Sequence, residues 1–198
     1  MKQILHILLI ALMLMGFYSC VPKTELASPD GHIKVAFTAD TDGKMMYRVT
    51  VNDTLLLDNS PLGFEAKDGI DLNRGFRVVN TVFTDKDEIW RQPWGENKTN
   101  RNHYNEMAVL LKNAANVELT LRFRAFDDGV AFRYELEGLQ HTAIRQDLTT
   151  YHISEGTRRW FQEWTESYEN FFALSTTGKG GKQHWGYPCL LEQNGVYS

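Results

Sequence analysis

The sequence contains few cysteines and has no excess of basic residues. Its two cysteines among 198 residues, Cys20 and Cys189, form neither a disulfide framework nor the spacing of a metal site. A formal net charge of -4 gives no basic surface for nucleic acid or for anionic lipid headgroups. We therefore expect no nucleic-acid partner and no electrostatic attachment to a membrane.

Common catalytic motifs and helical patterns are also missing. The sequence has no H-E-x-x-H, G-x-S-x-G or CxxC motif, and Gly178 to Lys182 lacks the spacing of a phosphate-binding loop. After the first 20 residues, no stretch shows three turns of helical periodicity. These absences favour an all-β chain and give no complete catalytic set.

The clearest pattern is a β-hairpin between Val117 and Leu136. Apolar residues alternate with polar ones on both sides of Phe126-Asp127-Asp128-Gly129, so one face of the hairpin is predicted to be buried. Asp-Gly between two such runs indicates a tight turn, because glycine tolerates positive φ. The buried face is rich in aromatic residues and must be covered by a second sheet.

Other segments extend the same pattern. A second hairpin is predicted over residues 32–51, with Asn52-Asp53 as the turn into a further strand, and more strands at 76–83, 107–112, 147–153 and 187–191. We expect Asp85 to Glu88 and Trp90 to Glu106 to be loops because they are polar and poor in periodicity. The sequence thus predicts an antiparallel β-sandwich.

Residues 1–20 have the composition of a secretory signal peptide. Lys2 precedes an apolar run that is too short to span a bilayer comfortably, and the segment ends on Ser19-Cys20. This resembles a bacterial lipoprotein signal, in which Cys20 is lipidated and residues 21–28 form a tether. We then expect a lipid-anchored protein of the periplasm or outer membrane; cleavage nearby without lipidation, giving a soluble periplasmic protein, is the alternative.

Three sets of titratable residues could take part in catalysis or metal binding, and each set also has a simpler structural explanation. Asp127 and Asp128 are adjacent carboxylates, but turn chemistry accounts for them. His103 and Glu106 could ligate a metal or bond within their loop. Glu163, Glu166 and Glu169 recur among aromatic residues, either as solvated charges or as part of a cation site completed from elsewhere.

An ordered set of short motifs resembles the N-terminal domain of glycoside hydrolase family 97, which comprises α-glycosidases. The motifs span nearly all of residues 29–198 and are Ser28-Pro29-Asp30-Gly31, Ser60-Pro61-Leu62-Gly63, Pro93-Trp94-Gly95-Glu96, Tyr104-Asn105-Glu106 and the hairpin sequence from Arg124 to Tyr134. The resemblance implies an antiparallel β-super-sandwich similar to galactose mutarotase, which packs on a catalytic (β/α)8 barrel. The two carboxylates of glycoside hydrolysis would belong to that barrel.

The resemblance also implies specific roles. One glutamate of this domain joins the calcium site of the family's active centre, and Tyr168-Glu169 resembles that position. Apart from the resemblance, Trp94 and Trp164 are candidates to contact an α-linked oligosaccharide as sugar-stacking rings, and packing is the alternative role of Trp164. The last residues look like a strand that has just begun, so we expect a domain truncated before the barrel and inactive alone.

Two other functions stay open. The chain could be a stand-alone carbohydrate-binding lipoprotein that stacks sugars on the Trp90–Tyr104 segment or on the cluster around Trp160 and Trp164. It could also be an interaction module without any glycan contact, in which an exposed apolar face pairs with another chain.

Overall fold

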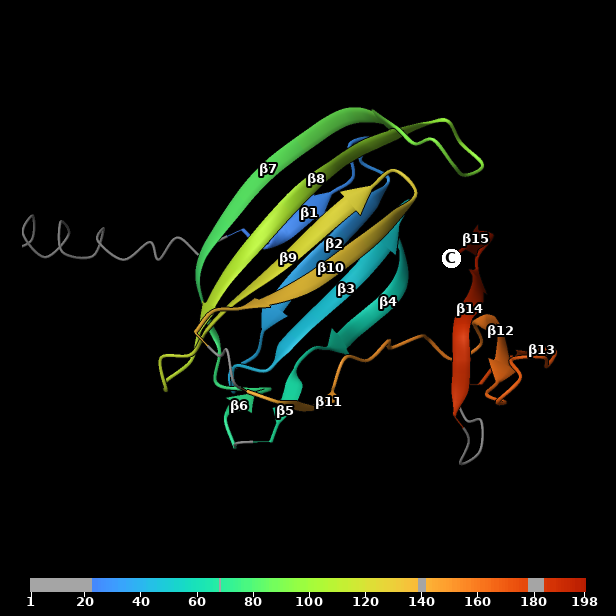
Figure 1. Ribbon diagram of the computed structural model, residues 1–198. Coiled ribbons are helices and arrows are strands. Elements are labelled where there is room, and N and C mark those ends of the chain that lie inside the picture. Colours follow the sequence, from blue (N-terminus) through green and yellow to red (C-terminus); the bar gives the residue numbers. More distant parts are fainter. Residues whose placement is uncertain (1–22, 68, 139–141, 178–183) are drawn as a thin grey trace, which may run out of the picture.

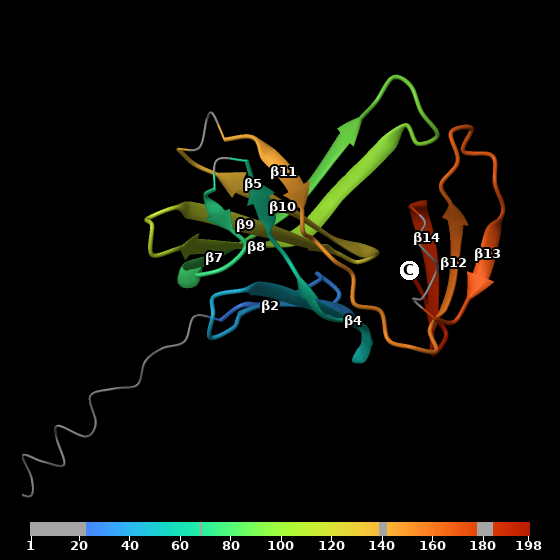
Figure 2. The same cartoon turned by 90° about the horizontal axis from the view of Figure 1, so that it is seen from below.

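The protein is an antiparallel β-sandwich with two smaller sheets beside it (Figures 1 and 2). The computed structural model describes residues 23–67, 69–138, 142–177 and 184–198, and these residues form strands and no helix. The all-β antiparallel fold predicted from the sequence is therefore confirmed.

One layer of the sandwich is a four-stranded sheet in the order β1-β2-β3-β4. Its alternating burial follows the alternating sequence, and Asn52 and Asp53 form the β3–β4 turn with φ of 49° and 61°. The expected tether ends earlier than residue 28, because residues 25–27 pair with β2. The strands are β1 (Glu25–Ala27), β2 (Ile33–Ala39), β3 (Met45–Val51) and β4 (Thr54–Pro61).

The facing layer has the order β10-β9-β8-β7 and contains the hairpin predicted between Val117 and Leu136. Its strands are β7 (Arg77–Arg91), β8 (Thr99–Lys112), β9 (Glu118–Phe126) and β10 (Gly129–Leu136). One detail differs from the prediction. Phe126 pairs with Gly129, and neither this glycine nor the two aspartates between them has a positive φ. The tight turn therefore does not depend on glycine's conformational freedom.

The core lies between these two layers. Phe37 of β2 and Phe123 of β9 are both fully buried, with ring centroids 6.3 Å apart. Tyr47 of β3 contacts Phe132 of β10 with centroids 5.3 Å apart. Each fully buried side chain of this size contributes roughly 1.5–3 kcal/mol. The second sheet predicted to cover the aromatic face of the hairpin is thus β1–β4.

The prediction of loops at residues 85–88 and 90–106 was wrong. β7 runs to Arg91 and β8 begins at Thr99, so irregular structure is confined to residues 92–98. Here both faces of the ribbon are largely in contact with solvent, and alternating polarity is not required. Cross-strand polar pairs take its place, such as Arg101 with Asp87 at 2.7 Å.

Two small sheets complete the described structure. One has the order β11-β5-β6 and the other the order β13-β12-β14-β15. The strand expected over residues 147–153 was largely wrong, because β11 ends at Asp147 and only His152 forms a further bridge, to Asp58. The strands are β5 (Phe64–Ala66), β6 (Asp71–Leu72), β11 (Ile144–Asp147), β12 (Arg158–Glu163), β13 (Phe172–Ser175), β14 (Trp185–Gln193) and β15 (Val196–Tyr197).

Some predictions concern residues outside the described ranges. The signal peptide, Cys20 and the glycine-rich stretch 178–182 all lie there. Within the described ranges, no helix is long and apolar enough to cross a membrane.

Candidate functional site

The segment between β12 and β13 holds the acidic and aromatic residues that the sequence singled out. Gln162 is buried at its base and donates its side-chain amide to the carbonyls of Tyr168 (2.9 Å) and Asn170 (2.8 Å). Tyr168 has a φ of 58°, a left-handed conformation that is uncommon for a residue with a side chain. A buried amide and a constrained backbone therefore define the position of Glu169.

The carboxylate of Glu169 lies in contact with solvent, as does that of Glu166. Among the described residues, no group of three or more His, Cys, Asp or Glu side chains is arranged to hold a metal ion. Calcium requires six to eight oxygen ligands, so Glu169 would hold such an ion only together with ligands from elsewhere.

The two candidate tryptophans come from different elements. Trp164 follows β12, is 47% exposed and has its backbone N–H bonded to His184 O at 2.8 Å. Trp94 is 85% exposed at the tip of the β7–β8 hairpin, where Gln92 donates to the carbonyl of Asn97 at 3.1 Å. In both views the hairpin tip lies on the same side of the molecule as β12–β15 (Figures 1 and 2).

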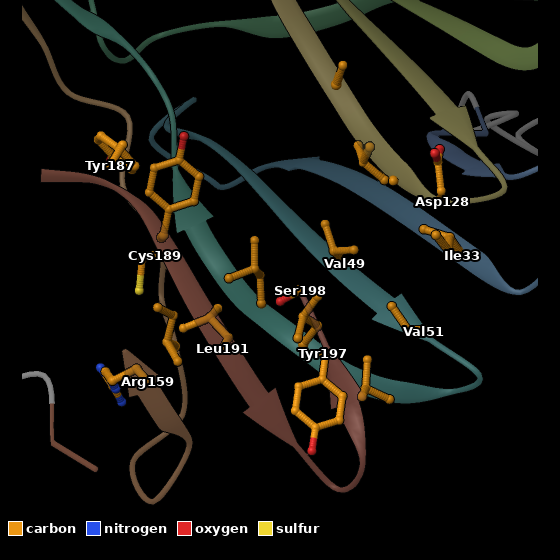
Figure 3. A pocket seen from close by; sticks show the side chains of 18 of the residues that line it. Ile33, Val49, Val51, Asp128, Arg159, Tyr187, Cys189, Leu191, Tyr197 and Ser198 are labelled. Atoms are coloured by element: carbon orange, nitrogen blue, oxygen red, sulfur yellow. The ribbon is translucent and has the colours of Figure 1, made fainter. Parts of the chain in front are cut away.

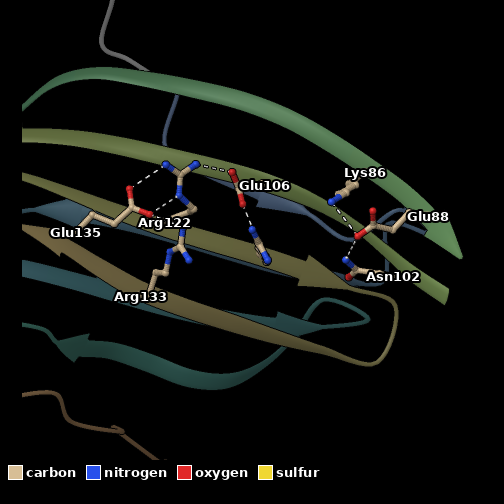
Figure 4. Close-up of polar contacts among 8 residues, drawn as sticks. Lys86, Glu88, Asn102, Glu106, Arg122, Arg133 and Glu135 are labelled. Carbon is tan, nitrogen blue, oxygen red and sulfur yellow. Dashed lines mark hydrogen bonds and ion pairs between the residues drawn. The ribbon is translucent and has the colours of Figure 1, made fainter. Parts of the chain in front are cut away.

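His103 and Glu106 are not brought together. His103 lies beside Asp127, with 3.8 Å between Nδ1 and Oδ2. Glu106 accepts hydrogen bonds from Arg122 (2.5 Å) and Arg124 (2.7 Å) on the outer face of the sheet (Figure 4). Burial opposes ionisation of Glu106, but these two arginines hold the pKa of its carboxyl below its usual range. Glu106 is therefore part of a structural ion-pair network.

Sequence reasoning did not find the cavity between the sandwich and β14. Its volume is about 960 Å³, and its lining includes Val49 and Val51 of β3 and Tyr187, Cys189 and Leu191 of β14 (Figure 3). These strands are far apart in the sequence. The apolar alternation of Tyr187, Cys189 and Leu191 along β14 is a sequence signal for a covered face, but nothing local identifies what covers it.

Arg159 is the basic side chain in the lining of this cavity, which also includes Asp127 and Asp128. It is 6% exposed and donates to the backbone carbonyls of Ser154 (3.1 Å) and Thr157 (3.4 Å). Burial raises the pKa of the nearby Cys189 thiol, although the charge of Arg159 opposes that shift. The thiol thus stays protonated, which makes Cys189 a poor nucleophile.

The arrangement of the strands defines the class of this protein as an all-β sandwich domain. The chain belongs to the family described as Glycosyl-hydrolase 97 N-terminal, whose model matches residues 26–198. The family resemblance noted in the sequence motifs is therefore confirmed, and the chain is a domain of a family of carbohydrate-active enzymes.

Two bacterial relatives support this assignment. The chain is 28% identical over 151 residues to a retaining α-galactosidase of Bacteroides thetaiotaomicron, a match that covers 76% of this chain and 22% of that enzyme. It is 23% identical over 158 residues to a probable retaining α-galactosidase of Streptomyces bingchenggensis, covering 80% of this chain and 25% of that protein. The chain thus spans about a quarter of these relatives.

Solved structures show the same domain. A glycoside hydrolase family 97 enzyme from Pseudoalteromonas sp. strain K8, solved with panose and with acarbose, matches with a TM-score of 0.76 and 26% identity. That match covers 86% of this chain and 27% of the enzyme. A β-arabinopyranosidase shares the fold with a TM-score of 0.75 at 22% identity, over 84% of this chain and 29% of that one.

Proposed function

We propose that this chain is the N-terminal, non-catalytic domain of a secreted α-glycosidase that acts on α-linked oligosaccharides. The domain supports the catalytic (β/α)8 barrel and lends Glu169 to a calcium ion at the active site. Trp94 and Trp164 contact the sugar. The hydrolytic carboxylates come from the barrel, so the chain alone has no hydrolase activity.

The observation that carries this proposal is the loop that presents Glu169. Its base is fixed by the two hydrogen bonds from Gln162, and its carboxylate points to solvent instead of pairing with a basic residue of the described structure. A fixed, unpaired carboxylate suits a metal site assembled from two domains, because its position is set before the metal arrives. Calcium would neutralise negative charge and orient the sugar there.

The test is a Glu169→Gln substitution in the full-length enzyme. The amide keeps the size of the side chain but removes its charge, so the calcium concentration for half-maximal hydrolysis of a nitrophenyl α-glycoside should rise at least about tenfold. Glu166→Gln is the matched control, since this carboxylate is exposed on the same loop. Equal calcium requirements for both variants and the wild type would contradict the role of Glu169.

We also propose that Cys20 carries a lipid and anchors the protein at the outer membrane or in the periplasm. The support is the sequence of the first 20 residues, which end in Ser19-Cys20. Cells that express the full precursor should incorporate labelled palmitate into the wild type and into Cys189→Ser. Cys20→Ser should abolish the label, and persistent labelling of that variant would refute lipidation at Cys20.

A second candidate function is a stand-alone carbohydrate-binding surface lipoprotein. The exposed indole of Trp94 favours it, because a sugar face can pack on an exposed ring. Affinity electrophoresis of residues 23–198 in soluble α-glucans separates the two functions. If the domain binds glycans by itself, the α-glucan should retard its migration, and Trp94→Ala should abolish this retardation. Phe171→Ala is the control, because it removes another exposed ring and should leave the retardation unchanged.

A further inference from the structure

Half of the β7–β8 hairpin extends beyond the sandwich. β8 pairs with β9 only from Asn105 to Lys112, but it pairs with β7 along its whole length. The segments 86–91 and 99–104 therefore form a ribbon of two strands, which overhangs the sheet (Figures 1 and 2). A two-stranded ribbon is only marginally stable in water unless something packs against it.

Polar contacts fix the register of this ribbon without covering it. Arg101 donates two hydrogen bonds of 2.7 Å to the carboxylate of Asp87. Glu88 accepts from Asn102 at 2.8 Å and pairs with Lys86 at 2.8 Å (Figure 4). Such exposed pairs add little stability because water and salt screen them. At the base of the ribbon, Tyr104 is covered by the ring of Phe126 and the guanidinium of Arg124, with centroid distances of 5.2 Å and 4.4 Å. Nearer the tip, residues 86–91 are exposed.

The ribbon exposes large apolar side chains. Ile89 is 67% exposed and Trp90 is 48% exposed, and as successive strand residues they point to opposite faces. An exposed ring on a projecting strand, such as that of Trp90, is typical of the anchoring residues of an interface, where a pocket in the partner desolvates the ring. Both faces of the ribbon therefore offer contacts to a partner.

We propose that the overhanging ribbon, residues 86–91 and 99–104, is a docking arm that packs on the catalytic part of the family 97 enzyme. The inference rests on the proposed function and adds the surface by which the two parts meet. Two observations select this occupant. The arm lies on the same side as the loop of Glu169, and about three-quarters of each curated relative lies outside the matched region. A catalytic part that contacts Glu169 thus lies on the side from which the arm projects (Figures 1 and 2).

Amide hydrogen exchange tests the docking. Exchange at residues 86–91 and 99–104 should be at least about 100-fold slower in the full-length enzyme than in residues 23–198 alone, because a docked ribbon opens only with the interface. Amides of β9 are the internal control and should exchange at similar rates in both proteins. Equal rates for the ribbon in both proteins would overturn the proposal.

A photo-crosslinking amino acid at position 90 identifies the occupant. In the full-length enzyme it should form crosslinks within one chain to the catalytic part. The same group at position 118 should not, because Glu118 is exposed at the opposite end of the sheet. A covalent dimer from position 90 would show that a second copy covers the arm, and would overturn the proposal.

Failure of this inference is distinct from failure of the proposed function. An enzyme that depends on Glu169 for calcium but exchanges its ribbon freely retains the proposed function and loses only the docking arm. An enzyme whose ribbon is protected from exchange but whose calcium requirement does not depend on Glu169 retains the docking arm and loses the proposed calcium role.

Discussion

The side-chain amide of Gln162 donates a hydrogen bond to the carbonyl of Tyr168 over 2.9 Å, across the base of the loop that presents Glu169. A second bond, to Asn170, lies on the other side of this glutamate. Gln162 is only 7% exposed, so the two bonds are sheltered from competing water. The glutamate is therefore held from both sides by one buried residue.

Gln162→Ala should weaken calcium binding without touching the ligand itself. Loss of both bonds frees the loop, and we expect the calcium concentration for half-maximal hydrolysis in the full-length enzyme to rise about tenfold. Gln146→Ala, at an exposed position in β11, is the control and should leave the requirement unchanged. An unchanged calcium requirement in Gln162→Ala would show that this residue does not position Glu169.

Phe123→Ala should destabilise the domain more than most single substitutions. The ring is fully buried and contacts the rings of Phe37 and Phe132, with centroids 6.3 Å and 5.8 Å away. Urea unfolding should show a loss of about 3–5 kcal/mol in the free energy of unfolding. Phe171→Ala removes the same atoms from a ring that is 89% exposed and should change stability by less than about 0.5 kcal/mol. Similar losses in both variants would contradict the assigned core.

Gly43 should tolerate alanine less well than Gly31. Both have left-handed backbones, with φ of 70° and 79°, but a Cβ at Gly43 would overlap the backbone of Gly75 and Phe76, whereas a Cβ at Gly31 would meet open space. Gly31→Ala should cost about 1–2 kcal/mol for its backbone conformation alone. Gly43→Ala should cost about 3 kcal/mol or more, because overpacking strain is added. Thermal and urea unfolding of the two variants measures the difference, and equal losses would contradict this close approach.

Stability should fall in acid as Glu135 is protonated. Hydrogen bonds from Arg122, and a further one from Arg133, lower the pKa of the Glu135 carboxyl from 4.5 to about 2. Since the folded-state pKa is the lower one, the ionised group stabilises the fold above pH 4.5, and this contribution is lost as the pH falls from 4.5 to about 2. Glu135→Gln removes this contribution, so its free energy of unfolding should fall less steeply over that range.

Glu137→Gln is the control for this pH dependence. Glu137 is exposed two residues further along the chain and forms no ion pair with the other described residues. Its substitution should leave the acid dependence of urea unfolding close to that of the wild type. If Glu135→Gln shows the wild-type slope as well, the arginine contacts do not contribute to acid stability.

The sequence predicted the two hairpins of the sandwich, in which one face is buried and the other is in contact with solvent. Alternation over 33–51 and 117–136 marks those strands because a period of two is what a half-buried sheet requires. The same rule failed over 85–106. Toward its tip that ribbon has solvent on both faces. Its pairing is fixed by contacts such as Arg101 with Asp87, and its polar residues resemble a loop.

The sequence by itself thus determined the fold class, the two hairpins, the family motifs and the candidate residues Trp94, Trp164 and Glu169. Only the tertiary structure decided which groups meet. It separated His103 from Glu106, placed Gln162 beneath the loop of Glu169, and formed a cavity from β3 and β14. Local periodicity specifies which face of a strand is buried, but contacts between distant strands depend on how whole sheets pack, and no short stretch of sequence encodes that packing.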